Sequence, residues 1–559
     1  MNTAALKDFA TTARRTLTEQ MRTRITHLLA DSGAALECPG EIAMLRAAVE
    51  KRGIDGAAET AAYTWFNRLT AARYLDVDNF SGPFRIVSPE PGSVFALPEI
   101  LTRAHAGEFP DDLVPTETQA AVGDLLSGRR ISPDPDLEAY TLLLHAVFRA
   151  WYTPLPEVFP AAVDWIRLLT PTDILAPTSV RAAAIAVMDE RACADVEVVG
   201  WLYQFYNAEL KALINESKVP IDAAELGPVT QLFTPHWIVR YLVENSLGRL
   251  WLRSRPTSGL RDHMQYYVEP VAGQDDTGIM VTAPEQIRLV DPACGSGHML
   301  TYAFDLLYLI YEEEGHEPTS IPRLILQHNL RGLEIDARAA QLASFALAMK
   351  ARERDPRFLT RKIQPDIVHL TPIEFTEDEV KAIVAAIADQ NPDTDTVEVA
   401  RLLYTFKDAD TFGSLLRVDA AAVEALAADL DVLEHGAHAL YTHNAIDRLT
   451  VLVRQARALV DRQYHVVVAN PPYLGSGNMG YLLSEFAKKQ YPETKADLYA
   501  MFIQRNAELA TAAGSVAMIT MHSWMFLTSV QEVPSESAEL GLPEFDGASG
   551  HPRLRFDQR

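Results

Sequence analysis

Three short segments of the sequence combine residue types that could bind a cofactor and act on an amino group. In the first, residues 289–300 (LVDPACGSGHML), an apolar run ends at Asp291 and a turn of small residues, which includes Ala293, opens a helix-like segment. Gly295 and Gly297 permit positive φ there and allow a ligand to approach the backbone. Asp291 could accept hydrogen bonds from a ligand's amino group. Taken alone, the segment could also be a tight turn between a strand and a helix.

The second segment, GLEID (332–336), ends another apolar run with an acid. Glu334 is expected at the carboxyl edge of the next strand, where acids of doubly wound sheets hold ribose hydroxyls. Asp336 is expected to begin the following helix and to cap it. Glu334 is therefore the candidate ribose ligand.

The third segment, VVVANPPYLGSG (466–477), is an apolar run that leads into Asn470, Pro471, Pro472 and Tyr473. Two prolines stiffen the turn and withhold backbone donors, which leaves the Asn470 side-chain oxygen and the Pro471 carbonyl as acceptors. Such a pair suits an amino group, and Tyr473 offers an aromatic face on which a flat base could stack. The alternative is a plain turn after a strand.

The elements that must position these residues follow a regular alternation. From about residue 229 onward, short apolar runs alternate with helical periodicity, which indicates a parallel sheet covered by helices. Strands are expected at 286–290, 329–334, 365–370, 464–469 and 515–520, and helices at 297–314, 337–350 and 497–510. An Ala-rich, acidic stretch at about 376–460 is expected to be a helical insertion. The fold class is therefore α/β.

The rest of the chain divides into two further regions. Residues 1–228 show apolar residues at helical spacing, for example at 196–214, in segments separated by prolines. They are expected to form a mostly α-helical N-terminal region. The sheet domain is expected to span 229–528, and residues 529–559 to be a divergent, disordered tail. Residues 509–530 lack charged side chains, but polar residues and a glycine interrupt them, so a buried strand with its loop is expected and not a membrane span.

Composition limits the functional classes. The chain of 559 residues carries 75 acidic and 50 basic residues, and its net charge of −25 is the wrong sign for coating nucleic acid nonspecifically. The three cysteines are far apart, which favours a reducing compartment and a cytoplasmic location. No metal is expected, because His435, His438 and His443 lack accompanying ligands at metal spacing. The sequence has no phosphate loop of the ATPase type.

Together the three segments resemble the amino-methylating DNA methyltransferases, in which D-P-A-C-G-S-G is the cofactor motif and N-P-P-Y the catalytic motif. Within that group the chain is similar to the PglX-like adenine-specific methyltransferases of BREX phage-defence systems. The resemblance is thin in the helical region and strong from about 196 to 528. Besides the two motifs, it rests on WLYQFYNAE (201–209), TQLFTPHWIVRYLVENSLGRLWL (230–252), IPRLILQHNLRGLEID (321–336), DADTFGSLL (408–416) and KADLYAMFIQR (495–505).

The resemblance implies a Rossmann-like domain that uses S-adenosylmethionine to methylate an adenine flipped out of double-stranded DNA. It assigns Phe233 and Thr234 to the F-T-P motif, where the threonine hydroxyl and nearby backbone bind the cofactor's carboxylate. It places Asp410 where an acid contacts the cofactor's adenine, although a helix-capping role is equally consistent. Other phage-defence proteins are the implied partners. Family members are considerably longer and carry a C-terminal target-recognition part, so this chain is expected to lack that part.

Two rival hypotheses remain open at this point. A protein-glutamine methyltransferase would use the same acceptors of the Asn470 turn for an amide nitrogen, although the F-T-P segment and the long helical region argue against it. A noncatalytic module would bind the cofactor or defence partners without turnover.

Overall fold

The computed structural model describes residues 2–93, 97–156, 158–159, 165–217, 219–221, 223–230, 234–270, 278–390, 392–435 and 443–521. The chain divides into two compact units, Met1–Glu209 with Leu359–Gln364, and Leu210–Phe358 with Pro365–Arg559. The division falls inside helix α8 (Glu197–Ser217), earlier than the boundary expected near residue 228. The expected tail, 529–559, lies outside the described residues.

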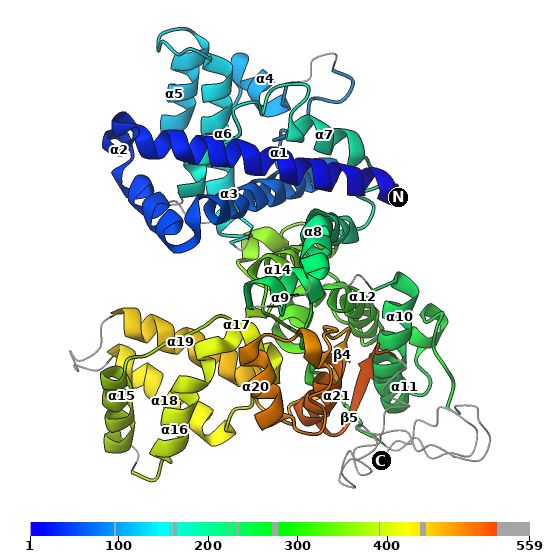
Figure 1. The fold of residues 1–559 in the computed structure, drawn as a ribbon. Helices are drawn as coiled ribbons and strands as arrows, with labels where there is room; N and C mark the ends of the chain where they lie inside the picture. The colour runs from blue at the N-terminus through cyan, green and yellow to red at the C-terminus, as the bar shows by residue number, and fades with distance from the viewer. Residues whose placement is uncertain are drawn as a thin grey trace. The chain divides into compact units, whose positions relative to one another are not determined.

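The first unit is helical, as the sequence predicts. Its core is formed by large apolar side chains such as Leu17, Trp65 and Tyr140, which are almost inaccessible to solvent. Helix starts use side-chain caps, as where Asp134 accepts a hydrogen bond from the backbone of Leu137. The helices are α1 (Thr3–Ala30), α2 (Ser32–Glu37), α3 (Pro39–Val77, broken at Gly53), α4 (Glu99–His105), α5 (Thr116–Leu126), α6 (Pro135–Tyr152), α7 (Val180–Val187) and most of α8 (Figure 1).

The second unit contains a parallel sheet of five strands in the order β3-β2-β1-β4-β5. The strands are β1 (Leu289–Asp291), β2 (Leu330–Glu334), β3 (Ile367–His369), β4 (Tyr464–Ala469) and β5 (Ala510–Met518). Every paired neighbour is parallel, with Leu289 opposite Leu330 on one side and Val466 on the other. The expected Rossmann-like α/β architecture is thus present. Strand order reverses between β1 and β4, and this switch point is where such sheets bind ligands.

Alternating side chains of the strands contact helices on opposite faces of the sheet. Val290, Leu333 and Val368 belong to one buried cluster with residues of α19 (His443–Ala458). Gly332 faces the other way, since a Cβ at this position would lie 2.9 Å from the Leu300 side chain of α12 (His298–Glu313). Helix α14 (Ala337–Arg354) contacts α12, β2 and β3, while α21 (Leu498–Leu509) contacts β4 and β5. The sheet is therefore covered on both faces.

The stretch at about 376–460, expected to be one helical insertion, consists of two pairs of helices. The segment between the two pairs returns to the edge of the sheet. Helices α15 (Glu377–Gln390), α16 (Thr396–Thr405), α18 (Ala420–His435) and α19 share one apolar core with the sheet (Figure 1). Between α16 and α18, the short helix α17 (Ala409–Phe412) contacts α9 (Ala223–Thr230) and α20 (Tyr481–Gln490). The remaining short helices are α10 (His236–Val243), α11 (Arg249–Ser254) and α13 (Ile321–Leu324).

The strand expected in residues 509–530 is present, but the expectation that it is buried was wrong. Only Ala510 of β5 is buried, and the later residues of the strand are partly or fully exposed. The reason is position, because β5 is the last strand in the order of the described sheet and, among the described residues, pairs with β4 alone. Within the described part of the chain, no helix is long and apolar enough to cross a membrane.

Candidate active site at the carboxyl edge of the sheet

The three chemistry-bearing segments meet at one edge of the sheet. Asp291 ends β1, Glu334 ends β2 and Asn470 directly follows β4. Because β1 lies between β2 and β4 and all pairs are parallel, the carboxyl ends of these three strands are neighbours. The switch point between β1 and β4 therefore brings the proposed cofactor residues next to the proposed catalytic turn.

The turn after β1 has the backbone conformation that its glycines predict. Gly295 has φ of 53° and Gly297 has φ of 89°, values that residues with a Cβ rarely adopt. At Gly297 a Cβ would also lie 3.1 Å from the backbone of Ala343 in α14, so this glycine allows α12 and α14 to approach closely. A Cβ at Gly295 would meet no atom within 4 Å, which leaves open space beside the turn.

Asp291 and Glu334 are both buried at this edge. Asp291 accepts a hydrogen bond from the backbone of Ala293 at 3.1 Å, and Glu334 accepts from the backbone of Gly295 at 2.8 Å. The other Glu334 oxygen accepts from the backbone of Ile335 and Asp336, at 3.0 and 2.9 Å. Glu334 thus joins the ends of β1 and β2 through its side chain.

Burial raises the pKa of both acids. Burial is the largest cause of the rise in the pKa of Asp291 to about 8, and the neighbouring Glu334 carboxylate adds to it. The pKa of Glu334 rises to about 7 because burial outweighs its three backbone donors. Because their pKa values are raised, these two carboxyl groups are stabilised in their ionised forms by a ligand that brings positive charge or hydroxyl donors to them.

Asp336 has the role that the sequence predicted, since it caps α14 by accepting from the backbone of Arg338 at 2.7 Å. Helix α9 passes close by, because a Cβ at Gly227 would lie 2.9 Å from an Asp336 oxygen. The glycine therefore permits α9 to approach the loop that follows β2.

The segment that carries Asp410 lies against the turns after β1 and β2. The Ser414 hydroxyl donates a hydrogen bond to the carbonyl of Pro292, and a Cβ at Gly413 would lie 2.8 Å from the Ile335 side chain. Asp410 itself is half-buried and accepts from the Thr411 hydroxyl at 3.4 Å. Its proposed contact with the cofactor's adenine stays a prediction. Sequence reasoning missed Ser414, whose residue type alone gave no signal.

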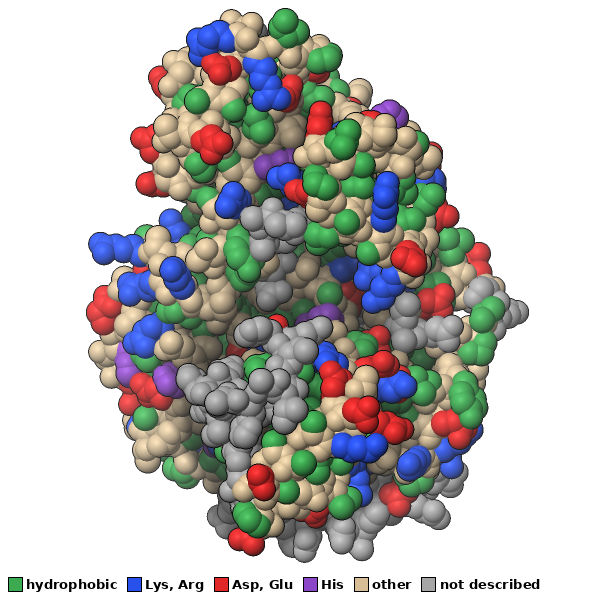
Figure 2. Space-filling view, turned by 90° about the vertical axis from the view of Figure 1, so that its left-hand side faces the viewer, with side chains coloured by type: hydrophobic (Ala, Val, Ile, Leu, Met, Phe, Trp, Pro, Cys, Tyr) green, Lys and Arg blue, Asp and Glu red, His purple; other side chains and the backbone are tan. Residues whose placement is uncertain are grey.

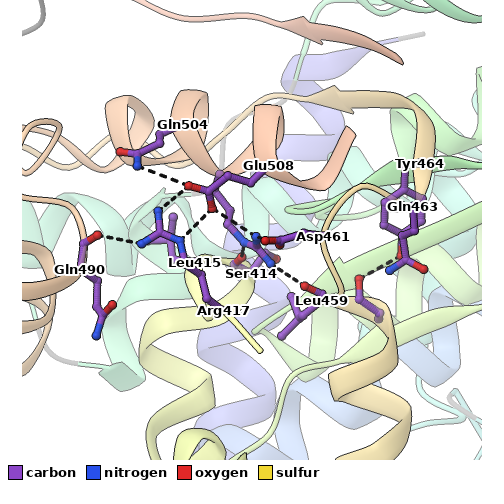
Figure 3. A network of polar contacts seen from close by, with 12 residues as sticks. Ser414, Leu415, Arg417, Leu459, Asp461, Gln463, Tyr464, Gln490, Gln504 and Glu508 are labelled. Carbon is purple, nitrogen blue, oxygen red and sulfur yellow. Dashed lines mark hydrogen bonds and ion pairs between the residues drawn. The ribbon is translucent and has the colours of Figure 1, made fainter. Parts of the chain in front are cut away.

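A buried polar network holds this segment in place (Figure 3). Arg505 of α21 is fully buried and donates to the carbonyls of Ser414 and Leu459, at 2.9 and 2.6 Å. It also pairs with Asp461 and Glu508. The guanidinium therefore links the Ser414 segment to the loop that precedes β4.

Arg417, which is partly exposed, extends the network (Figure 3). Its guanidinium makes two hydrogen bonds to Glu508, at 2.8 and 2.6 Å, and a third to the carbonyl of Gln490. It lies 4.2 Å from the centre of the Tyr491 ring, whose hydroxyl donates to the carbonyl of Leu415. The network thus holds the backbone at Ser414 and Leu415.

The turn after β4 holds the Asn470 amide at both ends. Its amide nitrogen donates to the Thr234 hydroxyl at 3.0 Å, and its oxygen lies 3.2 Å from the Tyr473 hydroxyl. The Tyr473 hydroxyl also donates to the carbonyl of Ile519 at 2.7 Å. Pro471 is buried, whereas Pro472 is half-buried.

Thr234 is thus brought to the turn after β4 from far away in the sequence, and it is 5% exposed. Phe233, the other residue of the expected F-T-P motif, lies outside the described residues. The side chains of His435, His438 and His443, which were weighed as metal ligands, are also outside them. Sequence reasoning gave no sign that Thr234 would contact Asn470.

A cavity of about 300 Å³ lies beside Tyr473. Its lining includes Tyr473 and Asn478 from the turn after β4, and Lys211, Ile214, Ile221 and Thr230 from α8, α9 and their connection. Ile221 pairs with this turn through the backbone of Asn478 at 2.9 Å. The volume is at the lower end of small-molecule pockets.

Comparison with known proteins agrees with the geometry. Residues 328–535 match the Eco57I restriction-modification methylase family. The chain is 38% identical over 509 residues to the adenine-specific methyltransferase BrxX of Escherichia coli O9:H4 (strain HS), covering 86% of this chain and 41% of that protein. The chain resembles the adenine-specific methyltransferases. It is also 33% identical over 587 residues to the adenine-specific methyltransferase PglX of Lacticaseibacillus casei (strain Zhang), covering 95% of this chain and 47% of that protein.

The chain therefore spans less than half the length of these two relatives. Among solved structures, a DrdV–DNA complex matches 94% of this chain and 37% of its own, with 13% identity and a TM-score of 0.40.

Proposed function

We propose that the second unit of this chain transfers a methyl group from S-adenosylmethionine to the N6 amino group of adenine in DNA. The observation that carries the proposal is the convergence of Asp291, Glu334 and Asn470 at the switch point of one parallel sheet. Relatives described as adenine-specific methyltransferases support it.

The residues at the edge of β1 and β2 fit the proposed cofactor. S-adenosylmethionine supplies a methyl group on a positively charged sulfur. Asp291 would accept hydrogen bonds from the cofactor's ammonium group and Glu334 from its ribose hydroxyls. The fit rests on two buried carboxyls with raised pKa values and on the open space beside Gly295, which leaves room for a ligand at the backbone.

Asn470 and Pro471 would act on the substrate's amino group. The amino lone pair of adenine is delocalised into the ring and is a poor nucleophile. Acceptance of its two hydrogens by the Asn470 oxygen and the Pro471 carbonyl favours a more pyramidal nitrogen and directs its lone pair toward the methyl group. This arrangement requires no strongly basic side chain.

Tyr473 and the adjoining cavity supply the proposed place for the base. The Tyr473 hydroxyl is tied to the carbonyl of Ile519, which fixes the ring, and the ring lines the cavity of about 300 Å³. An adenine flipped from double-stranded DNA would regain there some of the stacking that it loses. The second aromatic wall of such a pocket is not assigned.

The charge of the chain limits how DNA is held. Figure 2 shows Lys and Arg side chains interspersed with Asp and Glu on the face that it displays. With a net charge of −25, phosphate contacts must come from local basic groups. Partners from a phage-defence system and a cytoplasmic location remain expectations from the sequence.

The proposal is tested by methyl transfer. Purified chain, and a longer relative as a positive control, are incubated with DNA and isotope-labelled S-adenosylmethionine, and the DNA is digested to nucleosides. We expect labelled N6-methyl-2′-deoxyadenosine. Cofactor binding without transfer by this chain would instead support the noncatalytic module, and label in protein glutamine would support the glutamine methyltransferase.

A further inference from the structure

The hydrogen bond between Thr234 and Asn470 defines which end of the catalytic amide faces the substrate. An asparagine side chain presents a donor at one end and an acceptor at the other, and only the acceptor can hold an amino group. The Asn470 nitrogen points to the buried Thr234 hydroxyl at 3.0 Å, so its oxygen points the other way. We propose that Thr234 is a positioning residue that sets this orientation, an inference that rests on the proposed function.

The opposite orientation of the Asn470 side-chain amide would prevent it from accepting a hydrogen bond from the adenine amino group. With the amide turned around, the Asn470 nitrogen would face the adenine nitrogen, and two donors would oppose each other. The Tyr473 hydroxyl lies within hydrogen-bond distance of both the Asn470 oxygen and the Ile519 carbonyl, at 3.2 and 2.7 Å, and it can donate its single proton to only one of them. The carbonyl is the nearer acceptor, so a second group, Thr234, contributes to the choice between the two orientations.

The Thr234 hydroxyl selects the productive orientation when its proton is used elsewhere. A hydroxyl has one proton, and a hydroxyl that donates it to an anion can only accept from a second neighbour. If Thr234 donates to the cofactor's carboxylate, its oxygen must accept from the Asn470 nitrogen. Cofactor binding would thereby lock the Asn470 oxygen toward the base, which couples occupancy of the cofactor site to readiness of the catalytic turn.

The first test separates this role from simple cofactor binding by using saturating cofactor. Thr234→Val keeps the shape of the side chain and removes the hydroxyl, whereas Thr234→Ser restores it. We expect the valine variant to lose about tenfold in methyl-transfer rate at saturating cofactor, the scale of one lost hydrogen bond in the transition state, and the serine variant to recover most of it.

A matched control comes from the first unit. Thr70 is also buried, and its hydroxyl donates to the carbonyl of Phe66 in its own helix. Thr70→Val should leave the transfer rate unchanged, which shows that removing a buried threonine hydroxyl is not itself harmful. If higher cofactor concentration returned Thr234→Val fully to the wild-type rate, Thr234 would act on the cofactor alone and the proposal would be overturned.

The second test needs no turnover, so it separates this proposal from failure of the proposed function. Side-chain amide signals of isotope-labelled asparagine are recorded by NMR, with Asn470→Ala to assign the signal. Adding S-adenosylhomocysteine, which carries the same carboxylate, should slow exchange of the Asn470 amide protons in wild type and Thr234→Ser, and not in Thr234→Val. Equal exchange in all three would overturn the proposal even if the wild type methylates DNA.

Discussion

At the scale of single residues, the two buried acids at the ends of β1 and β2 govern how the proposed cofactor is held. Asp291 accepts a hydrogen bond from the backbone of the turn that follows β1. Glu334 accepts hydrogen bonds from the backbone of that same turn and from the backbone of the turn that follows β2. Their raised pKa values indicate that the site without ligand stabilises the protonated forms. A cation that enters the site would favour ionisation of both acids.

This arrangement predicts that cofactor affinity depends on pH. The pKa values of Asp291 and Glu334 rise to about 8 and about 7, so both acids are largely protonated at about pH 6 and lose protons as the pH rises. Affinity for the ammonium-bearing cofactor should increase from about pH 6 to about pH 7.5, which is below the usual pKa of an α-amino group. Calorimetric titration across this range measures it, and Asp291→Asn should flatten the profile. A flat wild-type profile would contradict the assignment.

The same groups affect stability in the opposite direction. Because their pKa values in the folded protein lie above the ordinary values of 3.8 and 4.5, they contribute stability that is fully present below about pH 4 and lost as the pH rises through about 7 and 8. In the absence of cofactor, Asp291→Asn should therefore raise the unfolding temperature at pH 8 more than at pH 6. An equal change at both pH values would show that Asp291 does not change its protonation state between them.

Glu334 is expected to contribute directly to cofactor binding. Glu334→Ala should weaken binding by about 1–3 kcal/mol, because ribose hydroxyls and three backbone donors lose their acceptor. Glu334→Gln, which keeps an acceptor oxygen and the side-chain length, should weaken it less. Calorimetry with the two variants gives the comparison, and wild-type affinity in the alanine variant would exclude the ribose role.

Asn470 is expected to serve the substrate and not the cofactor. Asn470→Ala should abolish methyl transfer in a longer relative aligned at this position, while cofactor affinity changes little, since its oxygen addresses the adenine nitrogen. Transfer assays and calorimetry on the same preparation test this. A parallel loss of both activities would assign Asn470 a structural role.

At the scale of elements, the segment between α16 and α18 depends on the Arg505 network for its position. Arg505 satisfies the carbonyls of Ser414 and Leu459 from a fully buried site, and Ser414 in turn contacts Pro292 of the turn after β1. Helix α21 thus supports the edge of the sheet that we propose to bind the cofactor, although it carries no proposed catalytic residue.

The network predicts different costs for its two arginines. Arg505→Gln should lower the free energy of unfolding by about 3 kcal/mol, because it leaves buried carbonyls and two acids without their cation. Arg417→Gln should cost about 1 kcal/mol, because Arg417 is partly exposed and water can replace it. Urea unfolding of both variants provides the measurement. Equal costs would show that the buried arginine is not the centre of the network.

At the scale of the whole molecule, charge predicts weak DNA binding by this chain alone. A net charge of −25 leaves local groups such as Lys488 and Lys489 of α20 to meet phosphates, and Lys488 already pairs with Glu485. Few phosphate contacts imply low affinity with a shallow dependence on salt. Titration against many duplexes at physiological salt should show binding without sequence preference. Tight, sequence-selective binding would refute this prediction.

The sequence by itself determined the elements and the residues at their ends. Apolar runs and helical periodicity located each strand of the sheet, and the positive φ of Gly295 and Gly297 and the cap at Asp336 follow from local backbone chemistry. These features depend on a few consecutive residues, so their signal is readable without a fold. The Asn-Pro-Pro-Tyr turn was recognisable for the same reason.

The tertiary structure alone decided which distant residues meet at the sheet edge. Thr234 reaches Asn470 across 236 positions and Ser414 reaches Pro292 across 122, contacts that no local pattern encodes. The same is true of β5, whose partial exposure follows from its place at the sheet edge and not from its uncharged sequence. Strand order and helix packing fix such pairings, because they bring together side chains whose identities carry no information about each other.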